Sequence, residues 1–308
     1  MNYARAVWLR LLATVLFALM ALCIRKAALD GAAVGQTVFW RSFMAIPPIL
    51  LYMAWRRSLP RALKTSNAYG HALRSGFGCV SMFLGFTALA HLPLTLATAM
   101  SFLAPLMSVP AAMVLLGEKP RASVVALTAL GFGGVALILL APAPEAGFSP
   151  VETPQGLLIG VLAGLAGAGF TVLAMIQVRD LTRTESPSTI AFYFSVFCAL
   201  AGAATFLRGD WPSFQGATLW WLMAAGILGG MAQISMTEAL ARAPVSALAA
   251  FEYVAMVWAL GFDVFIFGQV PGWMKLSGAA VIVAAAASAG ALNARARAGA
   301  VDSSGRTH

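Results

Sequence analysis

Ten predominantly apolar stretches, each of roughly 20 residues, follow one another along this chain of 308 residues. A helix of about 20 apolar residues is what crossing a bilayer requires, because the hydrocarbon core is ~30 Å thick. The composition agrees, since 60% of the residues are hydrophobic and 10% are charged, far from the values of a soluble domain. We therefore predict an all-α integral membrane protein with ten transmembrane helices, near residues 6–24, 33–55, 72–90, 94–116, 122–141, 156–177, 187–207, 217–240, 244–267 and 273–291.

The Lys and Arg residues lie unevenly between these stretches. If the N-terminus is inside, fifteen of the twenty fall in inside segments and four in outside segments, and the remaining one, Arg41, lies within a span. This count predicts a multi-pass protein of the cytoplasmic (inner) membrane with both termini cytoplasmic. The basic residues punctuate apolar runs instead of gathering on one hydrophilic domain, so the net charge of +9 does not indicate nucleic acid as a partner.

A segment from the first half of the chain returns in the second. Residues 88–120 align without gaps with residues 239–271, 151 positions later. The helix-breaking residues of the two copies coincide: Pro93 with Pro244, Gly117 with Gly268 and Pro120 with Pro271. Five predicted spans lie in each half, and five is odd, so the second half must enter the membrane upside down relative to the first.

This repeat sets the predicted domain boundaries. Residues 1–141 form the first five-helix repeat, and residues 156–291 form the second. Residues 142–155 between them are rich in proline and contain no Lys or Arg, which is typical of a linker on the outside. Residues 292–308 are small, polar and basic, so we predict a disordered cytoplasmic tail.

Several short motifs lie along both halves of the chain. They are the Phe39–Phe43 run with its arginine, Ala88-Leu89 with Pro93, Pro105, Leu116–Pro120, Gly131–Gly134, Ala239-Leu240 with Pro244, Phe251–Tyr253, and Gly268 with Pro271. In this joint pattern the chain resembles the EamA-type ten-helix transporters of the drug/metabolite transporter superfamily. It departs from the family pattern at Gln269, where a glutamate often matches Glu118. The resemblance implies a basket of ten helices around a central cavity and transport of small metabolites by alternating access; known members export amino acids.

We accordingly predict a secondary transporter that exports small organic metabolites, with amino acids, aromatic ones included, as the expected substrates. An enzyme is not expected, and neither is a cofactor or a metal, because the chain lacks Walker A, HExxH, GxSxG and GxGD motifs. An intramembrane enzyme and a non-transporting membrane receptor or scaffold stay open as alternatives. The expected partners are the lipid bilayer and a small-molecule substrate, for a monomer or weak homodimer; coupling to protons stays open.

Charged residues inside predicted spans are the first candidates for the substrate site, because a charge in a bilayer usually faces a cavity or a partner. Arg41 and Glu252 each lie about eight residues into a span, near the midplane. Glu252 corresponds to Ser101 in the repeat, and the aromatic residues Phe102 and Tyr253 follow them. Glu252 is expected to contact the polar end of the substrate or to titrate during transport; the alternative is a structural pairing with Arg41 or with a helix backbone. Arg41 could bind a carboxylate, cap carbonyl groups or extend toward the membrane surface.

Five further residues complete the candidates. Gln233 and Trp40 lie within spans and are candidates for the cavity lining. Gln233 could bond the substrate or a neighbouring helix, and the second role is the more common one. Glu238 and Arg242 are four residues apart, which favours an ion pair on one helix face or a gating contact on the cytoplasmic side. Glu118, at the inner end of the fourth span, is a further candidate for gating or ion pairing.

Two features concern the fourth and ninth spans. Pro105 and Pro110 are expected to interrupt the fourth span and to free backbone carbonyl groups. Asp263 lies close to the outer surface in the ninth span, where we expect an exposed side chain at the interface.

Overall fold

The structure is a computed structural model, and it describes residues 3–304 without 58, 60–64, 66, 117–121, 142–152, 183, 210, 215, 241, 243–247, 249–250 and 252. The regular elements within the described residues are helices. In chain order the α-helices are α1 (Tyr3–Leu29), α2 (Val34–Trp55), α4 (Ala68–His91), α5 (Leu94–Ser101), α6 (Leu103–Leu116), α7 (Ala122–Leu140), α8 (Pro154–Leu181), α9 (Pro187–Phe206), α10 (Thr218–Leu240), α12 (Val254–Phe265) and α13 (Trp273–Ser304).

Seven of these helices are long and apolar enough to cross a membrane, namely α1, α2, α4, α7, α8, α9 and α10. Shorter apolar helical stretches lie at Leu94–Ser108, Val254–Phe265 and Trp273–Ala289, inside the three remaining predicted spans. The expected all-α architecture is confirmed. Of the ten expected spans, seven are present as long apolar helices in the described part of the chain.

The fourth predicted span, 94–116, is two helices instead of one. α5 ends at Ser101 and α6 begins at Leu103. The reason is Pro105, which has no N–H to donate to the carbonyl of Ser101 and whose ring collides with that carbonyl in a continuous helix. Serine hydroxyls satisfy carbonyls near the break: Ser101 Oγ donates to the Thr98 oxygen and Ser108 Oγ to the Pro105 oxygen, both at 2.6 Å.

The last helix is longer than predicted. α13 continues past residue 291 to Ser304, through most of the segment expected to be a disordered tail. Residues 292–304 contain several alanines and arginines and no proline, so helix propensity favours continuation of the preceding helix. Residues 305–308 lie outside the described part.

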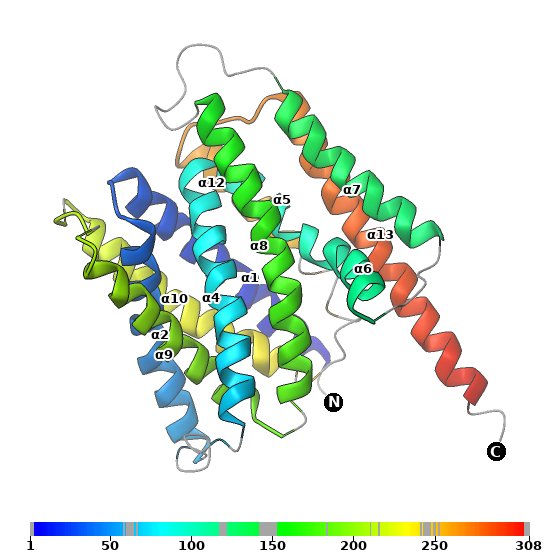
Figure 1. The fold of residues 1–308 in the computed structure, drawn as a ribbon, viewed down its shortest axis with the longest axis horizontal. Helices are drawn as coiled ribbons and strands as arrows, with labels where there is room; N and C mark the ends of the chain where they lie inside the picture. Colours follow the sequence, from blue (N-terminus) through cyan, green and yellow to red (C-terminus); the bar gives the residue numbers. More distant parts are fainter. Residues whose placement is uncertain are drawn as a thin grey trace.

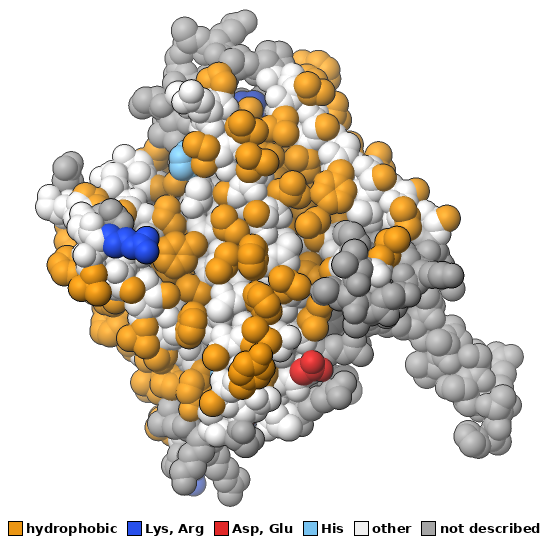
Figure 2. All heavy atoms as spheres, in the orientation of Figure 1, with side chains coloured by type: hydrophobic (Ala, Val, Ile, Leu, Met, Phe, Trp, Pro, Cys, Tyr) orange, Lys and Arg blue, Asp and Glu red, His pale blue; other side chains and the backbone are white. Residues whose placement is uncertain are grey.

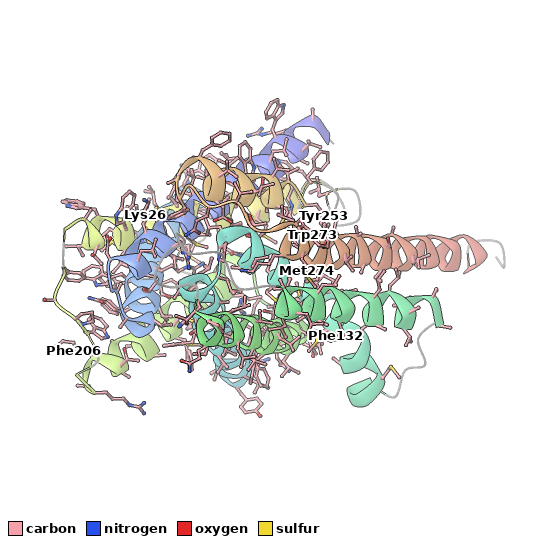
Figure 3. All side chains as sticks on the ribbon, turned by 90° about the horizontal axis from the view of Figure 1, so that it is seen from above. Lys26, Phe132, Phe206, Tyr253, Trp273 and Met274 are labelled. Carbon is pink, nitrogen blue, oxygen red and sulfur yellow. The ribbon has the colours of Figure 1, made fainter. Side chains whose placement is uncertain are left out.

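The helices form a large bundle with a helix pair beside it (Figure 1). Within the bundle the most extensive packing joins α4 to α8, α1 to α10, and α2 to both α9 and α10. The pair is α7 with α13, which run side by side in both Figure 1 and the view from above in Figure 3. α5 packs against α8, α12 and α13, so it links the bundle to the pair.

Glycines bring α7 and α13 into backbone contact. A Cβ atom placed on Gly134 would lie 2.7 Å from the carbonyl oxygen of Gly278 and 2.9 Å from Cγ1 of Ile282. A Cβ atom on Gly278 would lie 2.6 Å from the carbonyl oxygen of Gly134. Neither glycine has room for a side chain, and small residues at such crossings let membrane helices pack closely.

Large apolar side chains cover the outside of the molecule. Figure 2 shows a face on which hydrophobic side chains dominate and coloured charged side chains are few. Leu51, Leu200 and Phe265 are among the most exposed, at 73%, 67% and 88%. Trp55 and Trp273 are also exposed, and each lies at a helix end, the place where tryptophan meets the membrane interface. Such a surface suits a hydrocarbon solvent.

Asp263 is buried, which corrects the expectation of an exposed residue at the interface. Its side chain is 1% exposed and accepts hydrogen bonds from the backbone N–H groups of Leu94 and Thr95, at 2.9 and 2.7 Å. These are the first residues of α5, whose N–H groups have no acceptor within the helix. A carboxylate is favourable at this positive end of the helix dipole, so Asp263 of α12 caps α5.

Arg25 holds the helix end that precedes this cap. Its side chain is 1% exposed, and Nη1 donates hydrogen bonds of 2.9 Å to the carbonyl oxygens of Leu89 and Ala90, in the last turn of α4. A cation is favourable at the C-terminal end of a helix. We call residues 88–95, where α4 ends and α5 begins, the α4–α5 corner. One charged side chain from α1 and one from α12 hold it.

Candidate functional site

A cavity of about 400 Å³ lies between α2, α4, α8, α9 and α10. This volume is within the usual range for small-molecule sites, roughly 300–1,000 Å³. Part of the wall is apolar and includes Ala45, Ile49, Val178, Ile190 and Met236. The polar and charged side chains among the described lining residues are Arg41, Arg74, Thr182, Ser195, Gln233 and Thr237. An apolar wall with a few polar groups is the usual form of a solute site.

Arg41 enters the cavity from α2. Its side chain is 8% exposed, and its Nε atom has no hydrogen-bond partner among the described residues. Gly229 of α10 leaves room for it, since a Cβ atom on this glycine would lie 3.3 Å from Nε of Arg41. The sequence-based placement of Arg41 inside a span therefore corresponds to a residue that faces this cavity.

Arg74 enters from α4 and was not among the sequence candidates. Its guanidinium carbon lies 3.9 Å from the centroid of the Phe194 ring, a cation–π contact between α4 and α9. Its Nε and Nη1 atoms are buried without a hydrogen-bond partner among the described residues. Helical spacing could have drawn attention to Arg74, because it lies three and four residues from the buried His71 and Gly78.

Glu238, Arg242 and Tyr52 form a polar cluster beside the cavity. Arg242 Nη1 pairs with the Glu238 carboxylate four residues earlier, and the Tyr52 hydroxyl donates to the other oxygen of that carboxylate. Tyr52 lies near the end of α2 and Glu238 near the end of α10, directly after the lining residue Thr237. The cluster ties the ends of these two helices together.

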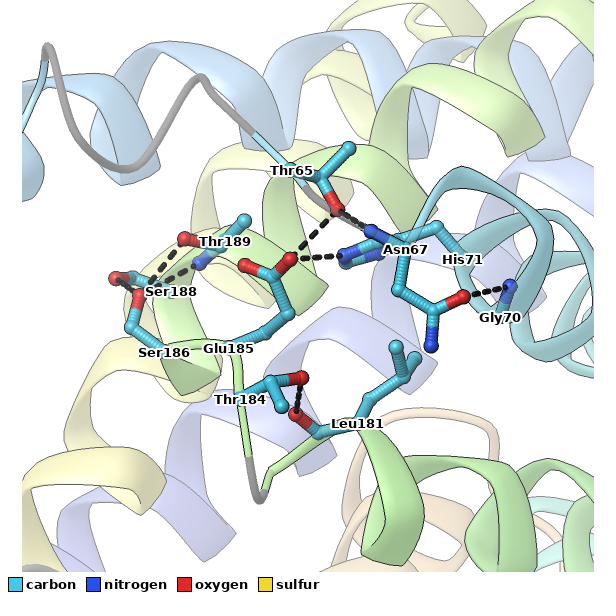
Figure 4. Close-up of polar contacts among 10 residues, drawn as sticks. All are labelled: Thr65, Asn67, Gly70, His71, Leu181, Thr184, Glu185, Ser186, Ser188 and Thr189. Atoms are coloured by element: carbon cyan, nitrogen blue, oxygen red, sulfur yellow. Dashed lines mark hydrogen bonds and ion pairs between the residues drawn. The ribbon is translucent and has the colours of Figure 1, made fainter.

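A second polar cluster lies at the turn between α8 and α9 (Figure 4). The Thr65 hydroxyl donates a 2.6 Å hydrogen bond to Oε1 of Glu185, and Nε2 of His71 lies 3.8 Å from the same oxygen. Thr182 and Pro187, on either side of Glu185, line the cavity. The cluster thus joins the segment before α4 to the rim of the cavity.

The structure brings only part of the predicted site together. Arg41 and Gln233 line the cavity, whereas Trp40, Ser101, Phe102 and Tyr253 are not among the residues that line it. Ser101 is exposed, and Phe102 is 6% exposed in a hydrophobic cluster, because burial among apolar side chains is favourable for an aromatic ring.

The remaining candidates lie in other surroundings. Tyr253 packs on Phe102, with 5.1 Å between ring centroids. Trp40 makes edge contacts with the rings of Phe39, Phe43 and Phe214. Glu252 and Glu118 lie outside the described residues.

Long apolar helices gathered around a cavity lined by Arg41 and Arg74 define a class of protein, the multi-pass membrane proteins. Comparison with known proteins places the chain within that class. It belongs to the EamA-like transporter family, whose profile matches residues 4–140 and 158–289. The resemblance recognised in the sequence is therefore confirmed.

The relatives of this chain include transporters of different metabolites. The pseudopaline exporter of Pseudomonas aeruginosa (strain UCBPP-PA14) is 26% identical over 284 residues, which are 91% of this chain and 93% of the exporter. The riboflavin transporter of Brucella anthropi is 28% identical over 253 residues, 80% of this chain and 84% of that protein. A solved crystal structure with 24% identity shares the fold, with a TM-score of 0.61 over 95% of this chain and 98% of the other.

Proposed function

We propose that this protein is a secondary transporter that moves small organic metabolites across the cytoplasmic membrane, with the cavity between α2, α4, α8, α9 and α10 as its substrate site. The observation that carries the proposal is the position of Arg41, a buried cation inside a bundle of apolar helices that faces a cavity of metabolite size. A charge at such a place is costly and usually belongs to a solute pathway. The relatives that transport pseudopaline and riboflavin support the substrate class.

Alternating access between two inverted repeats is part of the proposal. The packing pattern supports it. In the repeat, α4 corresponds to α10 and α1 corresponds to α8, so the pair α4–α8 has α10–α1 as its counterpart. Both pairs pack extensively. Phe102 and Tyr253 support it further, since they are 151 positions apart, the offset of the repeat, and their rings are in contact. Equivalent residues meet in this way where two copies are related by a two-fold axis.

We propose further that both termini are cytoplasmic and that the protein exports its substrates. The uneven distribution of Lys and Arg supports this orientation. In Figure 1 the start of α1 and the end of α13 both lie toward the lower side, as does the turn between α8 and α9. In this orientation the rim of the cavity at Thr182 and Pro187 faces the cytoplasm, the side from which an exporter loads.

Transport into proteoliposomes tests the proposal. Purified protein is reconstituted and supplied with labelled solutes that include amino acids, with and without a pH gradient, and protein-free vesicles serve as the control. We expect saturable uptake of at least one solute. Uptake that does not respond to the gradient would remove proton coupling, and uptake no greater than that of empty vesicles for every solute would overturn the transporter proposal.

A Glu252→Gln variant belongs in the same assay, because the sequence names Glu252 as the titrating candidate. We expect it to fold and to transport poorly. Uptake equal to that of the wild type would contradict a role of Glu252 in transport.

A further inference from the structure

The cavity contains two positive charges that the described residues do not neutralise. Arg41 and Arg74 both line it, and none of the other described lining residues is acidic. Their charges repel one another. Burying a cation in a medium of low dielectric constant carries a large free-energy penalty unless an anion accompanies it. The described lining of the cavity therefore holds two positive charges and supplies no negative one.

Two carboxylates beside the cavity take part in polar clusters of their own. Glu238 pairs with Arg242 and accepts from Tyr52. Glu185 accepts from Thr65 and faces His71. Each is held in its own cluster, and neither is among the residues that line the cavity.

From this arrangement we infer that the cavity binds small organic dianions, which bridge Arg41 and Arg74. The inference rests on the proposed transport function and names its substrate class. A guanidinium group presents parallel N–H donors that match two oxygens of a carboxylate or a phosphate. The buried Nε of Arg41 and the buried Nε and Nη1 of Arg74 are donors without a partner among the described residues.

The net charge of a solute decides how well it neutralises the two arginines. A dicarboxylate or a phosphate monoester brings two negative charges and neutralises both arginines. An acidic amino acid brings a net charge of −1, and a zwitterionic amino acid brings none. The described lining also offers no carboxylate to receive an ammonium group. Among amino acids, acidic ones therefore fit the cavity better than the aromatic ones expected from the sequence.

The rest of the cavity limits the size and shape of the occupant. The Phe194 ring holds the Arg74 guanidinium against one wall, so this donor is positioned before a solute arrives. Ser195 and Gln233 add short polar contacts, and Ile49 and Ile190 provide apolar surface for a short carbon chain. A volume of about 400 Å³ suits a compact metabolite.

Binding to the purified protein tests the inference without relying on transport. Ligand-induced shifts of the unfolding temperature are measured in detergent for succinate, glycerol 3-phosphate and phenylalanine, which represent dicarboxylates, phosphate monoesters and zwitterions. The variants are Arg41→Gln and Arg74→Gln, with Arg208→Gln as the matched control because Arg208 is exposed after α9. Unfolding temperatures without ligand are compared as well.

We expect succinate or glycerol 3-phosphate to stabilise the wild type and the Arg208 variant, and phenylalanine to have a much smaller effect. The more effective of the two anions identifies the head group. Each cavity variant should weaken anion binding by roughly 10- to 100-fold. Without ligand, these variants should be at least as stable as the wild type, as is common when a binding residue is replaced. Removal of a purely structural arginine would instead destabilise the protein.

Two outcomes would overturn the inference. One is a response to phenylalanine as large as that to the anions. The other is anion binding that is unchanged in both cavity variants. A protein that binds dianions but transports none of them in proteoliposomes would retain this inference and lose the proposed function, so the two failures are distinguishable.

Discussion

Replacing Asp263 by alanine removes the cap from the first turn of α5. The wild-type carboxylate is 1% exposed and accepts two backbone hydrogen bonds, from Leu94 and Thr95. A hydrogen bond to a charged group contributes about 1.5–3 kcal/mol. Two of them, with some compensation by relaxation of the helix end, give an expected loss of about 3 kcal/mol in the free energy of unfolding. Asp263→Asn retains one uncharged acceptor and should lose about half as much.

Unfolding by denaturant in detergent micelles measures this loss, with circular dichroism as the signal. Asp30→Ala is the matched control, because Asp30 is exposed in the turn after α1 and should change stability by no more than about 0.5 kcal/mol. If Asp263→Ala proved as stable as this control, the carboxylate would not be the cap that the geometry indicates, and the reasoning would be refuted.

Two other substitutions test helix packing at separate places. Gly134→Leu should separate α7 from α13 and lower the stability of the protein by about 1–3 kcal/mol. Gly133→Leu should have little effect, because nothing lies within 4 Å of the Cβ position of this glycine. Thermal unfolding in detergent compares the two variants. Equal losses in the two variants would contradict the close approach of these helices. Tyr52→Phe removes the hydroxyl bonded to Glu238 and should destabilise the protein by about 1 kcal/mol, with faster hydrogen exchange near the ends of α2 and α10. Exchange at the wild-type rate in both helices would show that this bond does not hold their ends together.

Local signals allowed the sequence to predict where helices begin. Thr153 and Ser186 each accept a hydrogen bond from a backbone N–H three residues later, and a proline occupies the next position in both cases. These are typical N-terminal caps. The expected starts at 156 and 187 are accordingly within two residues of the observed ones.

The break in the fourth span was only partly predictable. Both Pro105 and Pro110 could interrupt a helix, and the sequence does not say which turn opens. The structure has its break at Phe102, three residues before Pro105, while the backbone of α6 runs through position 110.

Side-chain direction explains why the predicted site was incomplete. Counting residues from a helix end gives depth in the membrane but not the direction in which a side chain points. Arg74 was not a candidate from the sequence, yet it lines the cavity, and Asp263 was placed at the surface, yet it caps a neighbouring helix. These contacts join helices far apart in sequence, so they follow only from tertiary packing. Glu252 stays a prediction.

The α4–α5 corner limits how the surrounding helices can move. Arg25, from the first half of the sequence, holds the end of α4, and Asp263, from the second half, holds the start of α5. Any movement that pulled α1 or α12 away would break the hydrogen bonds that satisfy a helix end, which is costly inside a membrane. In the alternating-access cycle proposed above, we therefore expect this corner to stay assembled and to act as the pivot about which the other helices turn.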